Sequence, residues 1–415
     1  MQIPSYPNAF QAPPPRFGST EVFDVGTSNN REGHERVLTL DDQFHPMGAV
    51  ADTTINSKGF QKDSDIVDGI ANHLIQEEVK YHPFLGAADH LNTIVGFLPG
   101  NPQGGLRLDD MNLICQDGHY AKDLNFNVMP GELQAAGIPL GNAFKMALYH
   151  DTAGGSAYAA HLLLTQEPYK SLFKPGTHAS YMVMGGGFGA SELYHNGDHV
   201  LSQELGPTPY LDRYSKTIQN TNAPDMLRQF CKEINLPEEQ IKALVEHANA
   251  RIVTQYDVAK KTFPGLSPEA YHAAADSAIQ GYMTGLATCC AGRYMVGSTL
   301  FLVSGPSAHG IEQYLKQPLT SQFQAEVDDF DRQYPSLKQA KTNFEKLLIM
   351  QTRRLIVAEK QKNPAISIDK AFDVTTAITA SDNTKGWPYL YNKGNIIQPE
   401  ADGAVRIPVS TLQTA

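Results

Sequence analysis

The sequence lacks the features of membrane-inserted and exported proteins. The 415-residue chain contains no run of about 18 apolar residues, so no membrane-spanning helix is expected. Its first residues, MQIPSYPNAFQAPPPRFGS, have neither a basic segment nor an apolar core and do not resemble a signal peptide. Their prolines instead predict an extended tail over residues 1–20.

Cysteines and basic residues are also scarce. The four cysteines show no CxxC or other metal-ligand spacing, and a bridge between the neighbours Cys289 and Cys290 would be strained. Reduced thiols and a cytoplasmic location are therefore expected. The 33 Lys and Arg residues are outnumbered by 44 Asp and Glu, which gives a net charge of −11. This balance argues against nucleic acid and anionic membranes as partners.

The chain is long enough for two or three domains, and its most informative stretch covers residues 181–209. An apolar strand there leads into Gly185, Gly186 and Gly187 and resumes after them. Asn196-Gly197 then predicts a hairpin turn. Glycines between two strands let the backbone approach a ligand and direct several N–H groups at phosphate oxygens. A glycine-rich turn without a ligand is the alternative interpretation.

A second candidate phosphate turn lies near the beginning of the chain. A strand over residues 21–25 leads directly into Gly26 and Thr27. Asp24 could hold the water shell of a Mg²⁺ ion while the turn amides and Thr27 face a phosphate. Ordinary loop chemistry explains the same residues, so the pattern alone does not decide between the two.

Strands and helices alternate through the first half of the chain. Strands are predicted over residues 36–44, 92–98 and 144–149, with a helix over 65–80, a loop over 106–126 and an alanine-rich helix after Asp151. This alternation predicts an α/β fold, in which chemistry sits at the carboxyl ends of strands. Asp24, Asp151 and Gly185 are each predicted at such an end. Helices are predicted over much of residues 225–360, and beyond residue 382 either an extra strand or an arm that packs on a partner fits.

The order of motifs resembles the ROK group (repressors, open reading frames and sugar kinases) of the actin-like, sugar-kinase and Hsp70 ATPase superfamily. The matching segments, in chain order, are FDVGTSN at 23–29, VGFLPG at 95–100, MNL at 111–113, YHD at 149–151, GGGFGAS at 185–191, QELGP at 203–207 and TLFLVSGPSAHGIEQYL at 299–315. Their order and spacing hold from about residue 20 to residue 320.

The resemblance implies a two-lobed actin-like ATPase (ribonuclease H-like) fold with helical additions in the C-terminal half. It divides the chain into a tail (1–20), an N-terminal α/β lobe (21–150), a C-terminal α/β lobe (151–345, with a helical insertion at about 211–295) and a final helix and tail (346–415). It also implies an ATP- and Mg²⁺-dependent kinase that acts on a hexose or amino sugar, and it leaves a homodimer open.

The same resemblance assigns roles to individual residues. Asp151 would be the general base. The nucleotide would contact Asp24, Gly26, Thr27, Gly185, Gly186, Gly187 and Gly305. The sugar would contact Asn112, His150 and Glu204, and Asp24 would hold Mg²⁺ through water. The alternatives are a helix cap for Asp151, an exposed loop acid for Glu204 and a buried, hydrogen-bonded histidine for His150.

The chain also departs from the family pattern. His150 replaces the asparagine before the catalytic aspartate, Gly186 replaces a threonine, and Pro207 replaces a sugar-binding histidine. The family's C-x-C-G zinc motif is absent, and no helix-turn-helix precedes residue 20. These changes leave a second function open, that of a nucleotide- or sugar-binding regulator or interaction protein without transfer activity.

Overall fold

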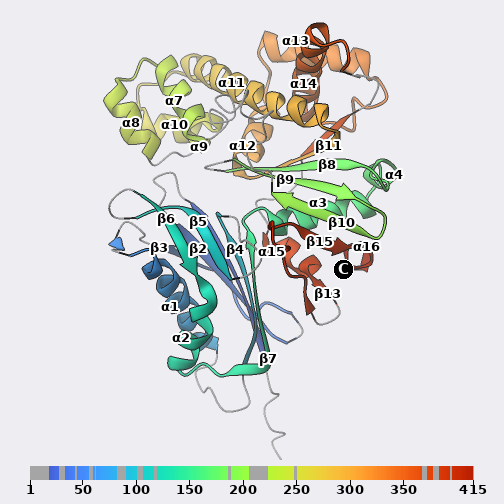
Figure 1. Cartoon of the computed structure of the whole chain (residues 1–415). Helices are drawn as coiled ribbons and strands as arrows, with labels where there is room; N and C mark the ends of the chain where they lie inside the picture. Colours follow the sequence, from blue (N-terminus) through green and yellow to red (C-terminus); the bar gives the residue numbers. More distant parts are fainter. Residues whose placement is uncertain are drawn as a thin grey trace, which may run out of the picture.

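Two β-sheets, each with helices packed on it, form the molecule (Figure 1). The computed structural model describes residues 18–27, 33–42, 44–55, 59–60, 62–81, 90–100, 106–115, 119–185, 188–204, 223–246, 250–366, 372–376, 383–392 and 395–414.

The first sheet has five strands in the order β3-β2-β1-β4-β7. They are β1 (Gly18–Thr27), β2 (Gly33–Leu40), β3 (Ala51–Ile55), β4 (His90–Leu98) and β7 (Leu140–His150). The strands β1, β2 and β3 are antiparallel neighbours, whereas β1, β4 and β7 run parallel. Almost every residue of β4 is buried, as expected of a central strand covered on both faces. Helices α1 (Ser64–Tyr81) and α2 (Met129–Ala135) lie over one face (Figure 1).

The second sheet repeats this plan. Its order is β12-β11-β8-β9-β10-β15, in which β8 (His178–Met184), β9 (Phe188–His195) and β10 (His199–Glu204) are antiparallel neighbours. The strands β11 (Ser298–Ser304) and β12 (Asp373–Thr376) follow parallel to β8. Three antiparallel strands followed by two parallel ones therefore occur twice, although the sequence shows no internal repeat.

Helices dominate the second half of the chain, and a large apolar cluster joins them to one face of the second sheet. These helices are α7 (Ala223–Glu233), α8 (Glu238–Glu246), α9 (Ala250–Thr254), α10 (Tyr256–Thr262), α11 (Pro268–Met295), α12 (Pro306–Tyr314), α13 (Ser321–Gln333) and α14 (Asn343–Lys362). Ser267 caps the start of α11, since its hydroxyl accepts a hydrogen bond from the Ala270 N–H at 3.2 Å.

A second apolar cluster joins the two sheets. It combines side chains of β4 and β7 with the predicted alanine-rich helix, α3 (Ala153–Thr165), and with the opposite face of the second sheet. The C-terminal residues complete it through α15 (Asn383–Gly386), the 3₁₀ helix η3 (Trp387–Leu390), β15 (Val405–Pro408) and α16 (Val409–Thr414). Smaller elements are η2 (Phe126–Val128), α4 (Tyr169–Leu172), β13 (Tyr391–Asn392) and β14 (Asn395–Ile396).

Two expectations about the chain path are settled by these elements. The tail beyond residue 382 adds a strand, because β15 pairs antiparallel with β10. The loop expected over residues 106–126 is wrong: this segment forms an antiparallel hairpin of β5 (Arg107–Ile114) and β6 (Tyr120–Asn125). The pairing register shifts between Met111 and Ile114, and this irregularity interrupts the period of two that identifies a strand in sequence.

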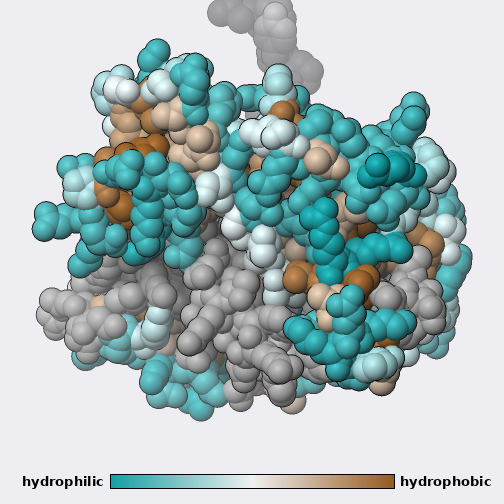
Figure 2. Space-filling model, turned by 90° about the horizontal axis from the view of Figure 1, so that it is seen from above, coloured by the Kyte–Doolittle hydropathy of each residue, from teal (hydrophilic) through white to brown (hydrophobic). Residues whose placement is uncertain are grey.

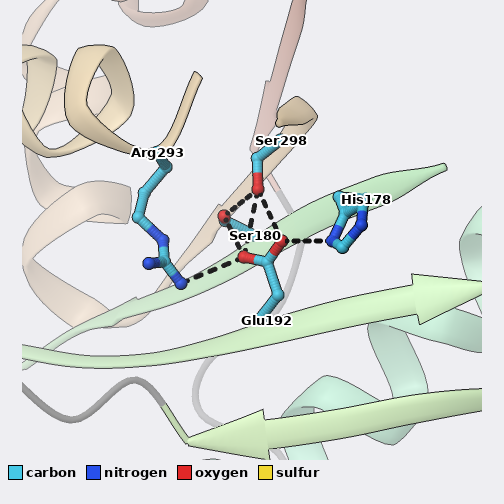
Figure 3. Close-up of polar contacts among 5 residues, drawn as sticks. All are labelled: His178, Ser180, Glu192, Arg293 and Ser298. Atoms are coloured by element: carbon cyan, nitrogen blue, oxygen red, sulfur yellow. Dashed lines mark hydrogen bonds and ion pairs between the residues drawn. The ribbon is translucent and has the colours of Figure 1, made fainter. Parts of the chain in front are cut away.

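A buried ionic network ties α11 to the second sheet (Figure 3). Glu192 on β9 accepts hydrogen bonds from Arg293 at 3.0 Å and from Ser298 at 2.8 Å, and it lies 3.0 Å from His178 Nδ1. Burial alone would raise the pKa of Glu192, but the hydrogen bonds from His178, Arg293 and Ser298, together with the charge of Arg293, hold that pKa below its usual value. The network fixes the end of α11 against three strands.

Replacing Glu192 by glutamine is expected to destabilise the protein by about 3 kcal/mol at pH 7, because it leaves Arg293 buried without its counter-charge. The lowered pKa sets the sign of the pH dependence: the stabilisation is present above pH 4.5 and is lost as the pH falls through the folded-state pKa. Urea unfolding of the wild type and the variant, at pH 7 and at a pH below 4.5, measures the difference in their free energies of unfolding. Glu400→Gln, at an exposed ion pair with Arg406, is the matched control. An equally small loss of unfolding free energy in Glu192→Gln and Glu400→Gln would contradict the prediction.

The face formed by the helices of the C-terminal half is mostly hydrophilic, with hydrophobic residues in separate patches (Figure 2). Among the helices of the described ranges, none is long and apolar enough to cross a bilayer.

Candidate active site

Three carboxylates from both sheets gather at one place. Asp24 lies on β1, Asp151 follows β7 directly, and Glu204 is the last residue of β10. Carboxylate oxygens of Asp151 and Glu204 and a ring nitrogen of His150 lie within 4.8 Å of one another. Asp24 is close enough for its charge to act on Asp151. Residues 180 positions apart in the chain thus share one acidic site.

The fold explains this convergence. The parallel strands β1, β4 and β7 end at one edge of the first sheet, where Asp24 is in register with Phe97 and His150 with Leu98. Helix α3 follows Asp151 and packs on β9 and β10 of the second sheet. The end of β10 is thereby brought to the end of β7.

The carboxyl group of Asp151 holds its proton unusually tightly. Burial raises its pKa most, the charges of Glu204 and Asp24 raise it further, and the result is a pKa of about 8. The side chain nevertheless remains partly exposed. A carboxyl with a pKa near neutral, beside other acids, is suited to accept and release a proton.

Asp151 does not cap the helix that follows it. Helix α3 begins at Ala153, and its N-cap is Thr152, which makes no side-chain capping bond. Asp151 thus lies one residue before the N-cap position of α3.

His150 is fully buried and neutral, because burial lowers its pKa to about 3. The Thr152 backbone N–H donates to its Nδ1 at 3.3 Å, and the Thr152 hydroxyl lies 2.6 Å from the same atom. A nitrogen that accepts these bonds carries no proton, so the proton sits on Nε2, which is buried and has no hydrogen-bond partner among the described residues. His150 thus has an unused donor, which suits an oxygen-bearing ligand better than a metal ion.

Asp24 forms an ion pair of 3.7 Å with Arg36, its cross-strand neighbour on β2. The turn expected at Gly26 and Thr27 is misplaced, because both residues belong to β1 and pair with β2. The pairing of β1 with β2 continues through Gly26 instead of ending there, because glycine permits a turn without requiring one. Asp24 therefore lies within a strand, three residues before its end.

The predicted phosphate-binding glycines differ in what surrounds them. A Cβ added at Gly26 or Gly185 would meet no atom of the described residues within 4 Å, so these residues leave the space beside both glycines open. Gly305 is different: it has φ +99°, and a Cβ there would lie 2.3 Å from the carbonyl oxygen of Met184. Only glycine allows β11 to turn into α12 this close to the end of β8.

The N-terminus of α12 faces the second glycine turn. The Ser307 hydroxyl in its first turn donates to the Gly185 carbonyl at 3.0 Å. Free N–H groups and the helix dipole make such an end suitable for an anion. Burial raises the pKa of the Tyr282 hydroxyl on α11. Tyr282 lines a pocket of about 460 Å³ between α7 and α11, together with Asp225, Met226, Arg228, Gln229, Lys232, Ser277, Ala278 and Gly281.

Some predicted site residues lie outside the described residues. Gly186 and Gly187 are in this group, as are the side chains of Thr27 and Asn112. The backbone of Asn112 lies in β5.

Several groups at the site escaped the sequence prediction. Ser191 and Thr152 extend the hydrogen-bond chain that orients His150, with their hydroxyls 2.5 Å apart. Ser307 contacts the glycine turn, and Tyr282 lines the pocket between α7 and α11. Serine, threonine and tyrosine are too common for a single sequence to reveal such roles, and only the tertiary contacts identify them.

Comparisons with known proteins address the fold. No protein-family model and no curated protein sequence matches the chain. Among solved structures, glucokinase from Balamuthia mandrillaris in complex with glucose is similar over 89% of this chain and 92% of its own, with a TM-score of 0.51 and 12% identity. The chain has the glucokinase fold. The likeness to actin-like sugar kinases expected from the motif order is thus confirmed for the fold.

Two further structures match less closely. Glucokinase from Parabacteroides distasonis has a TM-score of 0.49 at 11% identity, over 89% of this chain and 95% of its own. A ROK family glucokinase from Streptomyces griseus in complex with glucose and AMPPNP has a TM-score of 0.46 at 10% identity, over 88% and 96%. At such identities the similarity concerns the fold alone, so the function is argued from the site.

Proposed function

We propose that the protein is an ATP-dependent kinase that phosphorylates a hydroxyl of a hexose or amino sugar. The observation that carries the proposal is the convergence of Asp24, Asp151 and Glu204, with the pKa of Asp151 raised to about 8. The glucokinase fold supports it, and the open glycine positions beside β1 and β8 supply the space that phosphates need.

In the proposed reaction Asp151 is the general base. It accepts the proton of the sugar hydroxyl while that oxygen forms a bond to the γ-phosphorus of ATP and the bond to the β-phosphate oxygen breaks. The products are sugar phosphate and ADP, and the proton stays on Asp151 until it is lost to solvent. Such a transfer depends mainly on positioning and on charge stabilisation.

The acidic cluster fits Mg²⁺, a hard cation that prefers carboxylate and water oxygens. Asp24 would hold it through water. When bound, Mg²⁺ supplies positive charge that neutralises the phosphates and reduces the repulsion among the three carboxylates. His150 does not fit as a ligand in this cluster, because its Nδ1 accepts the Thr152 N–H and its Nε2 therefore carries the proton.

The sugar is assigned to the side of Glu204 and His150. The Glu204 carboxylate accepts hydrogen bonds from sugar hydroxyls, and His150 Nε2–H donates to a sugar oxygen. Asn112 is kept as a third proposed contact. These groups would place the attacking hydroxyl next to Asp151.

The nucleotide phosphates are assigned to the glycines of both lobes, and the nucleoside to the second lobe. Gly26, Thr27, Gly185, Gly186 and Gly187 would surround the phosphates, and Gly305 keeps the N-terminus of α12 close to them. The pocket between α7 and α11, at about 460 Å³, is of suitable size for a nucleoside.

A second function, that of a nucleotide- or sugar-binding regulator without transfer activity, is favoured by one observation. A pKa of about 8 leaves Asp151 mostly protonated at pH 7 in the absence of ligands, and a protonated carboxyl is no base. Under this alternative the protein binds ATP and sugar but releases no ADP.

Sugar-dependent ADP release by the full chain tests the proposal. With a panel of hexoses and amino sugars and Mg-ATP, we expect activity whose kcat/KM rises about tenfold per pH unit below pH 8 and levels off above it, because Asp151 must be ionised to act as base. Omitting the sugar is the control. Binding of ATP without ADP release for every sugar in the panel would favour the regulator.

The domain boundary, the cellular location and the oligomeric state are also proposals. Residues 346–415 contribute β12 and β15 to the second sheet, so we propose to count them with the C-terminal lobe rather than as a separate tail. We also propose a cytoplasmic location for such a kinase. A homodimer remains a prediction that light scattering would test.

A further inference from the structure

Three side chains with metal-binding atoms meet at the end of the β5–β6 hairpin, away from the carboxylate site. Asp63 lies immediately before α1, Cys115 follows β5, and His119 precedes β6. The Cys115 thiol donates to Asp63 Oδ1 at 3.5 Å, and His119 Nε2 lies 2.7 Å from the same oxygen. Sulfur, nitrogen and oxygen atoms of the three residues all lie within 4.8 Å of one another.

Hydrogen bonds from backbone N–H groups hold these residues in place. The Cys115 N–H donates to the His119 carbonyl at 2.9 Å, which fixes the two across the hairpin. The second oxygen of Asp63 accepts a hydrogen bond from the Lys122 N–H at 2.9 Å. The donor atoms are therefore brought together before any ion binds, which lowers the ordering cost of binding.

The separations match a tetrahedral zinc ion. With Zn–S of about 2.3 Å and Zn–N and Zn–O of about 2.0 Å, tetrahedral geometry places sulfur and oxygen about 3.5 Å apart and nitrogen and oxygen about 3.3 Å apart. The observed Cys115–Asp63 distance of 3.5 Å already agrees. The His119–Asp63 distance of 2.7 Å must open by roughly half an ångström, a small movement for an exposed histidine.

We propose that Asp63, Cys115 and His119 bind one Zn²⁺ ion, with water in the fourth position. A thiolate and an imidazole favour zinc over Mg²⁺ and Ca²⁺, which bind oxygen ligands. Cys115 is buried, whereas the side chains of Asp63 and His119 are 25% and 40% exposed, so an ion can enter from solvent. The ion clamps the β5–β6 hairpin to the start of α1. The spacing of the cysteines did not reveal this site, because Asp63 lies 52 positions before Cys115.

Cobalt titration of the full chain, purified with a chelator, tests the site. We expect one Co²⁺ per chain, with a thiolate-to-cobalt absorption band that Zn²⁺ removes by displacement. His119→Asn should weaken binding about 100-fold or more, since even residues that only support metal ligands contribute 10- to 100-fold. Cys115→Ser should abolish the band. Because Cys115 is a core residue, the exposed His119 decides the test if the serine variant fails to fold.

Two control variants exclude other sites. Cys231→Ser removes a buried thiol of α7, and Asp151→Asn alters the acidic cluster of the active site; both should keep the cobalt band and its affinity. Absence of a thiolate band, or unchanged affinity in His119→Asn, would mean that the three side chains only hydrogen-bond to one another and would overturn the proposal.

Discussion

Replacing Asp151 by asparagine is expected to lower sugar-dependent ADP release by about 10²–10⁴-fold, the usual contribution of a general base. Asparagine keeps the size of the side chain but cannot accept the proton of the attacking hydroxyl. Binding of Mg-ATP should persist, because the proposed phosphate contacts come from the glycine turns. The measurement is kcat for ADP release, with ATP affinity measured separately.

The same variant also shows whether activity is lost because the general base is absent or because the protein is unfolded. Burial and the charges of Glu204 and Asp24 disfavour the ionised form of Asp151. Asparagine removes that repulsion, so the melting temperature should not fall. Asp198→Asn, an exposed aspartate on the β9–β10 turn, is the matched control and should keep full activity. If Asp151→Asn retains more than about a tenth of the wild-type rate, Asp151 is not the base.

Regular elements with strong periodicity could be predicted from the sequence. In the helix α1 and the strand β4, the order of apolar residues directly indicates which side chains are buried. The serine at position 267, followed by proline, is typical of a helix start and marks the beginning of α11. The β5–β6 hairpin could not, because its register shift breaks the alternation. Likewise, the end of β1 depends on pairing with β2, which local sequence does not encode.

The acidic site was partly predictable for a related reason. Asp24 lies on β1 and Asp151 directly follows β7, and the parallel strands of one sheet present their carboxyl ends at a common edge. Glu204 comes from the other sheet, so its place depends on how α3 packs the lobes together. The Glu192 network has the same origin: its ion pair joins residues 101 positions apart, and neither carries a local signal.

Replacing Gly185 by valine is expected to abolish nucleotide binding without disturbing the fold. A Cβ at this position meets no atom of the described residues within 4 Å, so we expect the unliganded protein to tolerate the side chain. The same open space lies beside the N-terminus of α12, where the proposed phosphates approach the backbone. A valine there would occupy the volume that a phosphate needs. Gly26→Val makes the same test at the end of β1.

Thermal unfolding measures both effects. Mg-ATP at about 100 times its Kd should stabilise the wild type by about 2.7 kcal/mol, because the ligand binds only the native state. Gly185→Val and Gly26→Val should melt at the wild-type temperature without ATP and gain little with it. Gly265→Val, in an exposed turn where a side chain also meets nothing, should keep the full ATP-dependent shift. An unchanged shift in Gly185→Val would show that no phosphate lies against this turn, and the kinase proposal would lose its nucleotide site.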